Sequence, residues 1–414
     1  MLQIDHVYEF LYQEIFKQFN LVHLPGGVTK EQEISCTDIV VFTQGLHTTQ
    51  KIFFYDQEPL VERTARKYLD FFLYERNYTL SALAKLNATN KMPYKIPQFS
   101  DEIFEIHIKN PATVYKGATL VTSEHSALVN SLATQRDIKL IYYFFHGFAA
   151  LDWYRGYYAL NYNKTIVKPY KHDFITFNRI INNDRSYRIY FVSQLREQGL
   201  LEHGQVSFGV TDNLFDDWQD EVADPASKLS EQAKLHIERN LTGVSKLVID
   251  HAELPGSASA DIPRGIDALW HIVTETVFYY DKLHLTEKIF KPIVSKQPFM
   301  LLAAPGNLEY LRSYGFKTFD GIIDESYDNI QDPDARTEAV VAQLAWYCNL
   351  PAQEKNTVIE RLAPIVDYNF HHFYGEFRHI ITRELLSNTR TLFKEIGYDD
   401  SAIAYDDVYR VLTN

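Results

Sequence analysis

Four residues between positions 275 and 288 have side chains that could bind an anionic ligand. Glu275 follows a short apolar segment, and Thr286-Glu287-Lys288 opens the next predicted helix. Threonine is a frequent helix-capping residue, and the first N–H groups of a helix carry partial positive charge that suits a phosphate. Lys288 adds a full positive charge, while the carboxylate of Glu287 can accept hydrogen bonds from a ribose diol. The pattern predicts a site for a nucleoside diphosphate.

A second group of charged residues follows the predicted strand at 174–178. Arg179 directly follows that strand, at the end where open α/β sheets bind their ligands. Its planar, permanently charged guanidinium group suits a pyrophosphate. Arg185 and Arg188 begin the next helix, at 185–198. Both could instead lie on a solvated helix face, and this interpretation is favoured for Arg188.

These residues belong to a chain in which apolar strands alternate with helical segments. Strands are predicted at 38–43, 51–55, 118–122, 139–145, 174–178, 206–209, 246–249, 271–274 and 298–304. Helices are predicted at 5–19, 60–90, 125–134, 185–198, 339–346 and 370–386. This alternation predicts an α/β fold with a mostly parallel sheet and helices on both faces.

The composition limits the classes of protein to which the chain can belong. With 414 residues, two domains are expected. A net charge of −13 excludes a generally basic nucleic-acid-binding surface, although residues 161–198 carry a local excess of positive charge. Two distant cysteines argue against a disulfide framework. The sequence contains neither a signal-peptide pattern nor a long apolar run. We therefore predict a cytoplasmic protein without a membrane span.

The segment 265–325 resembles the donor-binding core of GT-B glycosyltransferases, and it is most similar to the fucosyltransferase-like group. A strand end with Glu275, a spacer, the Thr286-Glu287-Lys288 helix start and an apolar strand carry the resemblance. Residues 173–210 are similar to the first strand and helix of the same domain. The resemblance implies that Arg179 contacts the β-phosphate and Lys288 a diphosphate oxygen. It also implies that Glu287 holds the ribose hydroxyls and Glu275 faces the donor sugar.

The resemblance also implies the domain organisation. Two Rossmann-like domains would face a central cleft, the first over 1–165 binding the acceptor and the second over 166–365 binding the nucleotide-sugar. Helices over 366–414 would cross back onto the first domain. The enzyme would transfer a hexose or pentose from a UDP- or GDP-linked donor to a hydroxyl group, with inversion. The sequence leaves open which sugar and nucleotide the enzyme uses, whether the transfer inverts or retains the configuration of the sugar, and the oligomeric state.

An inverting transfer needs a base that takes the proton of the acceptor hydroxyl. Candidates follow the strands of the first domain: the pair Asp56 and Glu58, then Glu124, then His146 with Asp152 nearby. The Asp56 and Glu58 pair is the most suggestive, because two carboxylates end a strand just before a proline. Each could equally cap a helix, and His146 could simply be a strand-end histidine with its hydrogen bonds satisfied.

The departing diphosphate needs positive charge, which a metal or fixed cations can supply. Asp332-Pro333-Asp334 has the spelling of a metal-binding Asp-x-Asp motif, but it lies in a polar stretch before a helix and is interpreted as a helix start. GT-B enzymes generally use cations and helix dipoles. We therefore predict no essential metal and no cofactor besides the nucleotide-sugar.

Three interpretations of the chain's function remain open from the sequence. The resemblance extends to phage-encoded transferases that modify hydroxymethylated bases, so the favoured acceptor is double-stranded DNA with such bases, modified in the host cytoplasm. Candidate phosphate contacts are Arg63, Arg66, Lys67, Lys164, Lys168 and Lys171. The second interpretation is transfer to a cell-surface glycan or lipid-linked sugar, with aromatic residues at 145–158 as the platform. The third is a non-catalytic nucleotide- or carbohydrate-binding module.

Overall fold

The computed structural model describes two compact units of the chain. It covers residues 139–209, 218–225, 227–244, 247, 267–396 and 404–413, with short segments at 21–22, 40–43, 51–54, 119–122, 125–127, 130 and 134. Beyond the first two residues, the first unit combines 3–148 with 381–414, and the second unit spans 149–380. The unit boundaries fall inside α7 (Phe145–Trp153) and inside α17 (Glu376–Ile396). The domain boundaries at 165 and 365 remain predictions.

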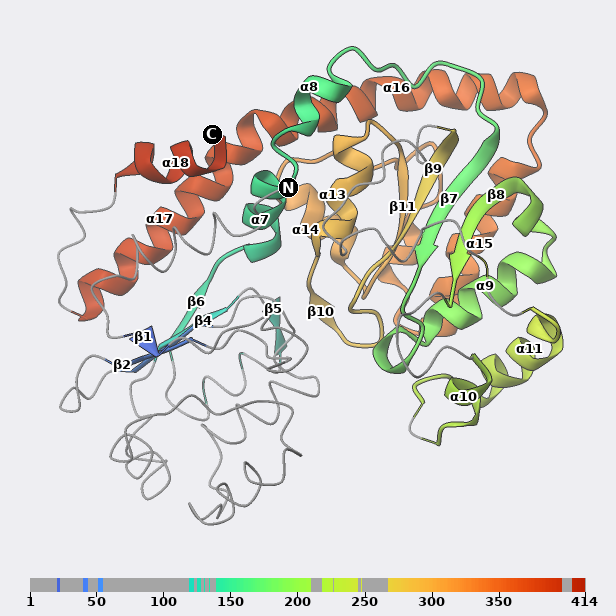
Figure 1. The fold of residues 1–414 in the computed structure, drawn as a ribbon, viewed down its shortest axis with the longest axis horizontal. Coiled ribbons are helices and arrows are strands. Elements are labelled where there is room, and N and C mark those ends of the chain that lie inside the picture. Colours follow the sequence, from blue (N-terminus) through green and yellow to red (C-terminus); the bar gives the residue numbers. More distant parts are fainter. Residues whose placement is uncertain are drawn as a thin grey trace. The chain divides into compact units, whose positions relative to one another are not determined.

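A four-stranded parallel sheet forms the centre of the second unit (Figure 1). Its strands are β7 (His172–Asn178), β8 (Gly204–Phe208), β9 (Ala268–Thr274) and β11 (Phe299–Leu302). All three neighbouring pairs are parallel. Every residue of β9 is buried, which is typical of a strand covered on both faces. The predicted parallel α/β arrangement is therefore confirmed for this unit.

Helices connect and surround these strands. They are α8 (Tyr157–Asn161), α9 (Tyr187–Glu197), α10 (Trp218–Ala223), α11 (Glu231–Leu241), α13 (Glu287–Val294), α14 (Asn307–Ser313), α15 (Pro333–Cys348) and α16 (Ala352–Tyr374). Short 3₁₀ turns lie at Asn183–Arg185, Leu200–His203 and Ser326–Asn329. Helix α9 packs against α11 and α15, and α13 packs against α16 and β9. The residues of α13 that face this core include Ile289, Phe290 and Ile293, which are at most 2% exposed.

The strand order places a topological switch between β7 and β9. The order is β11-β9-β7-β8, so the chain moves from β7 to β8 on one side and then to β9 on the other side of β7. In sheets of this kind, ligands bind at the carboxyl ends of the two strands where the direction of winding changes. The carboxyl ends of β7 and β9 are therefore the place where this unit should bind a ligand.

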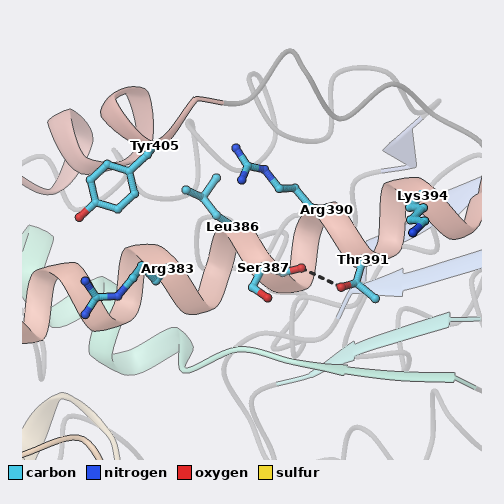
Figure 2. Close-up of a pocket in the computed structure, with 7 residues that line it drawn as sticks. All are labelled: Arg383, Leu386, Ser387, Arg390, Thr391, Lys394 and Tyr405. Atoms are coloured by element: carbon cyan, nitrogen blue, oxygen red, sulfur yellow. Dashed lines mark hydrogen bonds between the residues drawn. The ribbon is translucent and has the colours of Figure 1, made fainter.

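The sheet of the first unit is mixed. Strands β3 (Lys51–Phe54), β4 (Thr119–Thr122) and β6 (Lys139–Tyr142) are parallel neighbours. Strands β1 (Leu21–Val22) and β2 (Val40–Thr43) extend this sheet in antiparallel fashion. The prediction of a mostly parallel sheet therefore holds for only part of this unit. The short strand β5 (His125–Ser126) and helix α18 (Tyr405–Thr413) also belong to the first unit, as does the part of α17 shown in Figure 2.

Two predicted elements have different ends in the structure. Strand 139–145 stops at Tyr142, and His146 lies in the first turn of α7. Helix 370–386 is divided at Gly375 into the end of α16 and the start of α17. A Cβ atom at position 375 would lie 2.8 Å from the carbonyl oxygen of His371. Only glycine allows the chain to turn this closely between the two helices.

No helix among the described residues has both the length and the apolar character that crossing a membrane requires.

Burial of His271 in β9 predicts a pH-dependent stability. Desolvation lowers its pKa from 6.5 to about 3. Below pH 6.5 the imidazole of His271 is protonated in the unfolded chain but remains neutral in the folded chain. The free energy of unfolding should therefore fall by up to about 1.4 kcal/mol per pH unit until the pH reaches the pKa of His271 in the folded state. Urea denaturation of His271→Gln should show a shallower decline on acidification than the unmodified protein. An equal decline in the two proteins would contradict the prediction that His271 is neutral in the folded state.

Candidate functional site

The predicted donor residues of both sequence segments lie at the carboxyl edge of the second unit's sheet. β7 and β9 pair in a register that sets Ile175 opposite His271 and Thr176 opposite Ile272. If this register is extended beyond the ends of the two strands, Arg179 corresponds to Glu275. The two segments are therefore brought to one edge, at the topological switch.

Glu275 holds the start of α13 in place. The side chain is fully buried. Its Oε1 atom accepts a hydrogen bond from the backbone N–H of Thr286 at 3.1 Å, and its Oε2 atom accepts bonds from the Thr286 hydroxyl at 2.5 Å and from the Thr276 N–H at 3.2 Å. Both carboxylate oxygens are thus bonded to the protein. These contacts indicate that Glu275 positions the start of α13, and the sugar contact that the resemblance implies remains a prediction.

The N-terminal turn of α13 forms as the sequence predicts. Thr286 is the N-cap in an extended conformation, and its hydroxyl oxygen accepts a bond from the Lys288 N–H at 3.4 Å. The proline at position 292 lies inside the helix, which ends soon afterwards at Val294. The short helix therefore directs its positive end towards the same edge as Arg179 and Glu275.

Lys288 completes this network and keeps partial access to solvent. Its Nζ atom lies 3.1 Å from Thr276 Oγ1, from Thr286 Oγ1 and from the carboxylate of Glu287. The side chain of Lys288 is 24% exposed and that of Glu287 only 5%. The side chain of Lys288 is therefore partly accessible to a ligand, whereas a ribose could reach Glu287 only after this ion pair rearranges.

Two buried arginines that sequence analysis did not assign to the site support the loop after β9. Arg188 is 3% exposed and donates to the carbonyl oxygens of Ile180 at 2.8 Å and Thr274 at 2.7 Å. It therefore ties together the segments that follow β7 and β9, and the interpretation of Arg188 as a solvated residue is wrong. Arg336 is 1% exposed and donates to the carbonyl oxygen of Phe278 at 2.7 Å.

These guanidinium groups also contribute positive charge near the switch. Burial lowers the pKa of Arg188, and burial lowers the pKa of Arg336 to about 10. Arginine side chains in proteins remain protonated at neutral pH. The carboxylates of Glu275 and Glu287 offset part of this charge. Arg179 and Arg185, which are half-buried, add two further cations. The edge is therefore suited to an anionic ligand.

A buried amide oxygen lies beside Arg179. Asn178 ends β7 and is fully buried. Its amide nitrogen bonds to Thr176 Oγ1 at 3.2 Å, whereas its Oδ1 atom has no hydrogen-bond partner among the described residues. Buried polar atoms rarely remain unpaired.

Tyr154, which sequence analysis did not single out, belongs to the same surroundings. It is fully buried, and within the described part of the chain its hydroxyl group has no hydrogen-bond partner. Burial raises its pKa well above 10.0, and the negative charge of Glu287 raises it further. The hydroxyl therefore stays protonated and can act only as a neutral hydrogen-bond donor or acceptor. An apolar and aromatic stretch such as 143–154 contains no signal that distinguishes this tyrosine from its neighbours.

The candidates for the catalytic base are placed only in part. Asp56, Glu58 and Glu124 lie outside the described residues. His146 is 7% exposed in α7, with its ring 5.2 Å from that of Phe145. Asp152 in the same helix is 1% exposed and forms an ion pair with Arg155 at 2.7 Å. The base therefore remains a prediction at all of these positions.

The Asp-x-Asp spelling at 332–334 belongs to a helix start, as predicted. Asp332 is the N-cap of α15 and accepts a hydrogen bond from the Ala335 N–H at 2.8 Å. Pro333 occupies the first helical position, where proline is favoured. The carboxylate of Asp334 instead contacts the hydroxyl of Ser230. The motif is thus used for capping and for contact with α11.

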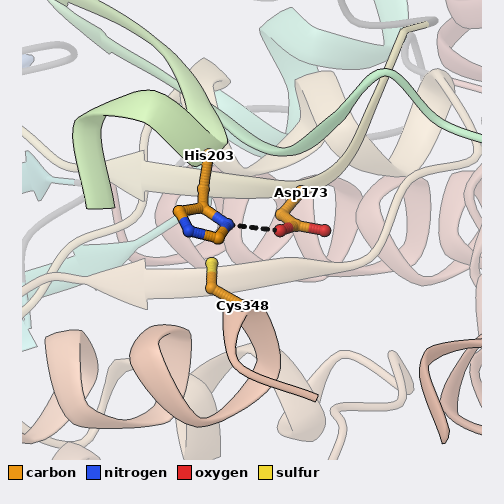
Figure 3. Close-up of side chains that lie close together, drawn as sticks. All are labelled: Asp173, His203 and Cys348. Atoms are coloured by element: carbon orange, nitrogen blue, oxygen red, sulfur yellow. Dashed lines mark hydrogen bonds and ion pairs between the residues drawn. The ribbon is translucent and has the colours of Figure 1, made fainter. Parts of the chain in front are cut away.

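A cluster at the opposite end of β7 contains side chains that can bind metals. Asp173, His203 and Cys348 offer ligand atoms within 4.8 Å of one another, and the Sγ atom of Cys348 points towards the other two (Figure 3). His203 Nδ1 lies 2.9 Å from the Asp173 carboxylate. Lys355 Nζ lies 2.8 and 2.7 Å from its two oxygens. The carboxylate already has a cationic partner, so we interpret the cluster as a structural ion-pair network.

The thiol in this cluster should be unreactive. Burial, together with the nearby charge of Asp173, raises the pKa of Cys348 to about 12. Since the thiolate is the nucleophile, a Cys36→Ser variant should react with iodoacetamide at near-neutral pH only after unfolding. Mass spectrometry of native and urea-treated samples measures the difference. Rapid labelling of the native variant would contradict this prediction.

Comparison with protein-family profiles and curated proteins identified no relative of this chain. No protein-family profile matches the chain, and no curated protein matches it at a significant level. The geometry of the site is therefore the support for a functional assignment.

Proposed function

We propose that the chain is a glycosyltransferase of the GT-B type that uses a nucleotide-sugar donor. The observation that carries the proposal is the convergence of Arg179 and the α13 helix start at the switch between β7 and β9. Open parallel sheets bind their ligands at this edge. A departing nucleoside diphosphate needs fixed positive charge at its binding site.

Each residue has a distinct task in this proposal. The Arg179 guanidinium binds the β-phosphate, and the N-terminal turn of α13 with Lys288 binds the remaining diphosphate oxygens. Glu275, Thr286 and Arg188 position that turn and its loop. Glu287 exchanges its bond to Lys288 for the ribose hydroxyls when the donor enters. The base is supplied by Asp56, Glu58 or His146 and takes the proton of the acceptor hydroxyl as the sugar is transferred.

Thermal-shift measurements with UDP, GDP and their sugar conjugates test the proposal. One nucleotide class should raise the melting temperature, because a ligand that binds only the folded state stabilises it. A panel of sugar nucleotides should then show slow hydrolysis or transfer. Binding without turnover would favour a non-catalytic module on the same scaffold, and no shift with either nucleotide would contradict the donor site.

Removal of divalent metals should leave transfer unchanged. In the proposal, Arg179, Lys288 and the start of α13 stabilise the negative charge of the leaving diphosphate, and none of these groups needs a metal to do so. Activity assayed with and without excess EDTA should therefore agree within about twofold, far below the loss expected when a group that stabilises the transition state is removed. A loss that Mg²⁺ or Mn²⁺ restores would contradict this assignment.

A further inference from the structure

The C-terminal end of α13 is closed by a turn in which glycine is usual. The Gln297 N–H donates to the Pro292 carbonyl oxygen at 2.9 Å, and the Lys296 N–H donates to the Ile293 carbonyl oxygen at 3.2 Å. These two bonds define a Schellman motif, whose left-handed residue is usually glycine. Here that residue is Lys296, with a φ of 52°, and it is the one non-glycine residue with a positive φ in the described part of the chain. Such backbone strain persists only where surrounding contacts hold it.

The side chain of Lys296 makes such contacts. It is 4% exposed, and its Nζ atom donates to the Tyr162 carbonyl oxygen at 3.0 Å and forms an ion pair with Asp367 at 2.9 Å. The ammonium group also lies 4.5 Å from the centre of the Phe370 ring, on which Tyr158 of α8 stacks with ring centroids 5.6 Å apart. The end of α13 is therefore tied both to α16 and to the segment that follows α8.

Two side chains from α8 and the segment after it bond in return to the end of α13. Asn161, the last residue of α8, donates through Nδ2 to the carbonyl oxygen of Val294 at 2.8 Å, and Val294 is the last residue of α13. Lys164 Nζ donates to the next carbonyl oxygen, that of Ser295. A cation is favourable at this end of a helix, because the carbonyl groups there carry partial negative charge. Hydrogen bonds thus run in both directions between the two segments.

A helix as short as α13 is positioned mainly by the contacts that hold its two ends. It has eight residues, so it is roughly 12 Å long at about 1.5 Å per residue, and a helix of this length is marginal on its own. Pro292 also lacks the N–H that would bond to the carbonyl group four residues earlier. Glu275 holds the N-terminal end through Thr286. Displacement of the C-terminal end would therefore move the N-terminal turn as well.

We infer that Asn161, Lys164 and Lys296, together the α13 clasp, are positioning residues that keep the N-terminal turn of α13 in its anion-binding position. None of the three needs to touch the ligand, since the helix transmits their effect to Lys288 and to the N–H groups of the first turn. That the ligand is a nucleoside diphosphate rests on the proposed function. The coupling between the two ends of α13 rests on the contacts of the α13 clasp alone.

The α13 clasp gives Lys164 a role that sequence analysis did not predict. Of the other lysines in this segment, Lys171 forms an ion pair with Asp267 at 2.8 Å, and Lys168 Nζ lies 5.0 Å from the centre of the Tyr170 ring. Contact between these three lysines and DNA phosphates stays a prediction. The remaining candidates for such contacts, Arg63, Arg66 and Lys67, lie outside the described residues.

Calorimetric titration with UDP, GDP and inorganic pyrophosphate, well below the melting temperature, tests the inference. In the double variant Asn161→Ala, Lys164→Met, the dissociation constant of the ligand that binds should rise about tenfold, the lower end of the losses observed when a group that orients a metal ligand is removed. Lys164→Met alone should show part of this rise. Lys164→Arg keeps a cationic donor for the Ser295 carbonyl oxygen and should bind nearly as tightly as the unmodified protein.

The variant Lys296→Gly separates positioning from stability. Glycine adopts the left-handed conformation without strain, so the melting temperature should stay within a few degrees of the unmodified value. Loss of the contacts with Tyr162 and Asp367 should nevertheless weaken ligand binding. Lower stability with an unchanged dissociation constant, in this variant and in the double variant, would make the α13 clasp a purely structural feature and overturn the inference.

Matched controls remove the same kinds of side chain from exposed positions of the second unit. Asn163→Ala changes an asparagine two residues after Asn161, and Lys317→Met removes a lysine from another part of the unit. Both controls should keep the dissociation constant of the unmodified protein. A rise in the controls equal to that in the double variant would also overturn the inference.

Hydrogen–deuterium exchange reports on the start of α13 without a ligand. Peptides over residues 284–290 include the Thr286 N–H, which bonds to Glu275, and they lie at the N-terminal end of the helix, away from the substituted residues. Their exchange should be faster in Lys296→Gly and in the double variant than in the unmodified protein. If no phosphate compound binds the unmodified protein but exchange rises in this way, the donor site is wrong and the coupling through α13 is supported. Unchanged exchange overturns the inference, even where nucleotide binding supports the donor site.

Discussion

Replacement of Arg179 by alanine should reduce the rate of sugar transfer by about 100- to 1,000-fold. The guanidinium is the group assigned to the β-phosphate, and loss of one donor that stabilises developing negative charge commonly has an effect of this size. Arg179→Lys should recover only part of the rate, because a point charge does not reproduce the two parallel bonds of the guanidinium. Initial rates at saturating donor, with kcat and KM determined separately, measure the effect.

The same variant should fold normally. Arg179 is half-buried and directly follows β7, so the melting temperature of the Arg179→Ala variant should fall by no more than a few degrees. Arg196→Ala, at an exposed position on α9, is the matched control and should retain full activity. A large loss of stability in Arg179→Ala, with proportionate loss of activity, would make Arg179 a structural residue and remove it from the donor site.

Replacement of Glu275 by alanine should instead lower stability by about 3 kcal/mol. The change leaves the Thr286 N–H, the Thr286 hydroxyl and the Thr276 N–H without their acceptor in a fully buried place. Unpaired buried polar groups cost about 1–3 kcal/mol each, and local relaxation recovers part of this. Glu275→Gln keeps one carbonyl acceptor and should lose less. Urea denaturation measures the free energy of unfolding for both variants.

Glu309→Ala provides the comparison for the effect of removing a glutamate. Glu309 is exposed in the first turn of α14, and its replacement should change stability by less than about 1 kcal/mol. If Glu275→Ala were as stable as this control but inactive, Glu275 would have to contact the donor sugar, as the resemblance implied, and its positioning role would be wrong.

Local signals explain why the strands and the helix start around Thr286 could be predicted from the sequence. Thr286 is a strong capping residue, Pro292 limits the helix that follows, and apolar strands flank both. β7, β9 and β11 were predicted within a few residues because they are short apolar runs bounded by polar residues. These features depend on residues that are close in the sequence, and such local patterns can be recognised from one sequence alone.

The contacts that organise the site depend on residues far apart in the sequence. Arg188 bonds to Thr274, 86 residues away, and Arg336 bonds to Phe278, 58 residues away. A charged residue at a helix position gives no sign that carbonyl oxygens of a distant loop will satisfy it, so the solvated interpretation was the natural one. Likewise, the bonds of Glu275 to Thr286 are visible only once the strand and the helix start are adjacent.

A crystal structure of the protein with UDP or GDP bound tests the central claim most directly. The diphosphate is predicted to lie at the N-terminal turn of α13, within hydrogen-bonding distance of the Arg179 guanidinium and of Lys288 Nζ, with Glu275 still bonded to Thr286. A nucleotide bound away from the carboxyl ends of β7 and β9, or a guanidinium of Arg179 directed away from the phosphates, would contradict the proposed function.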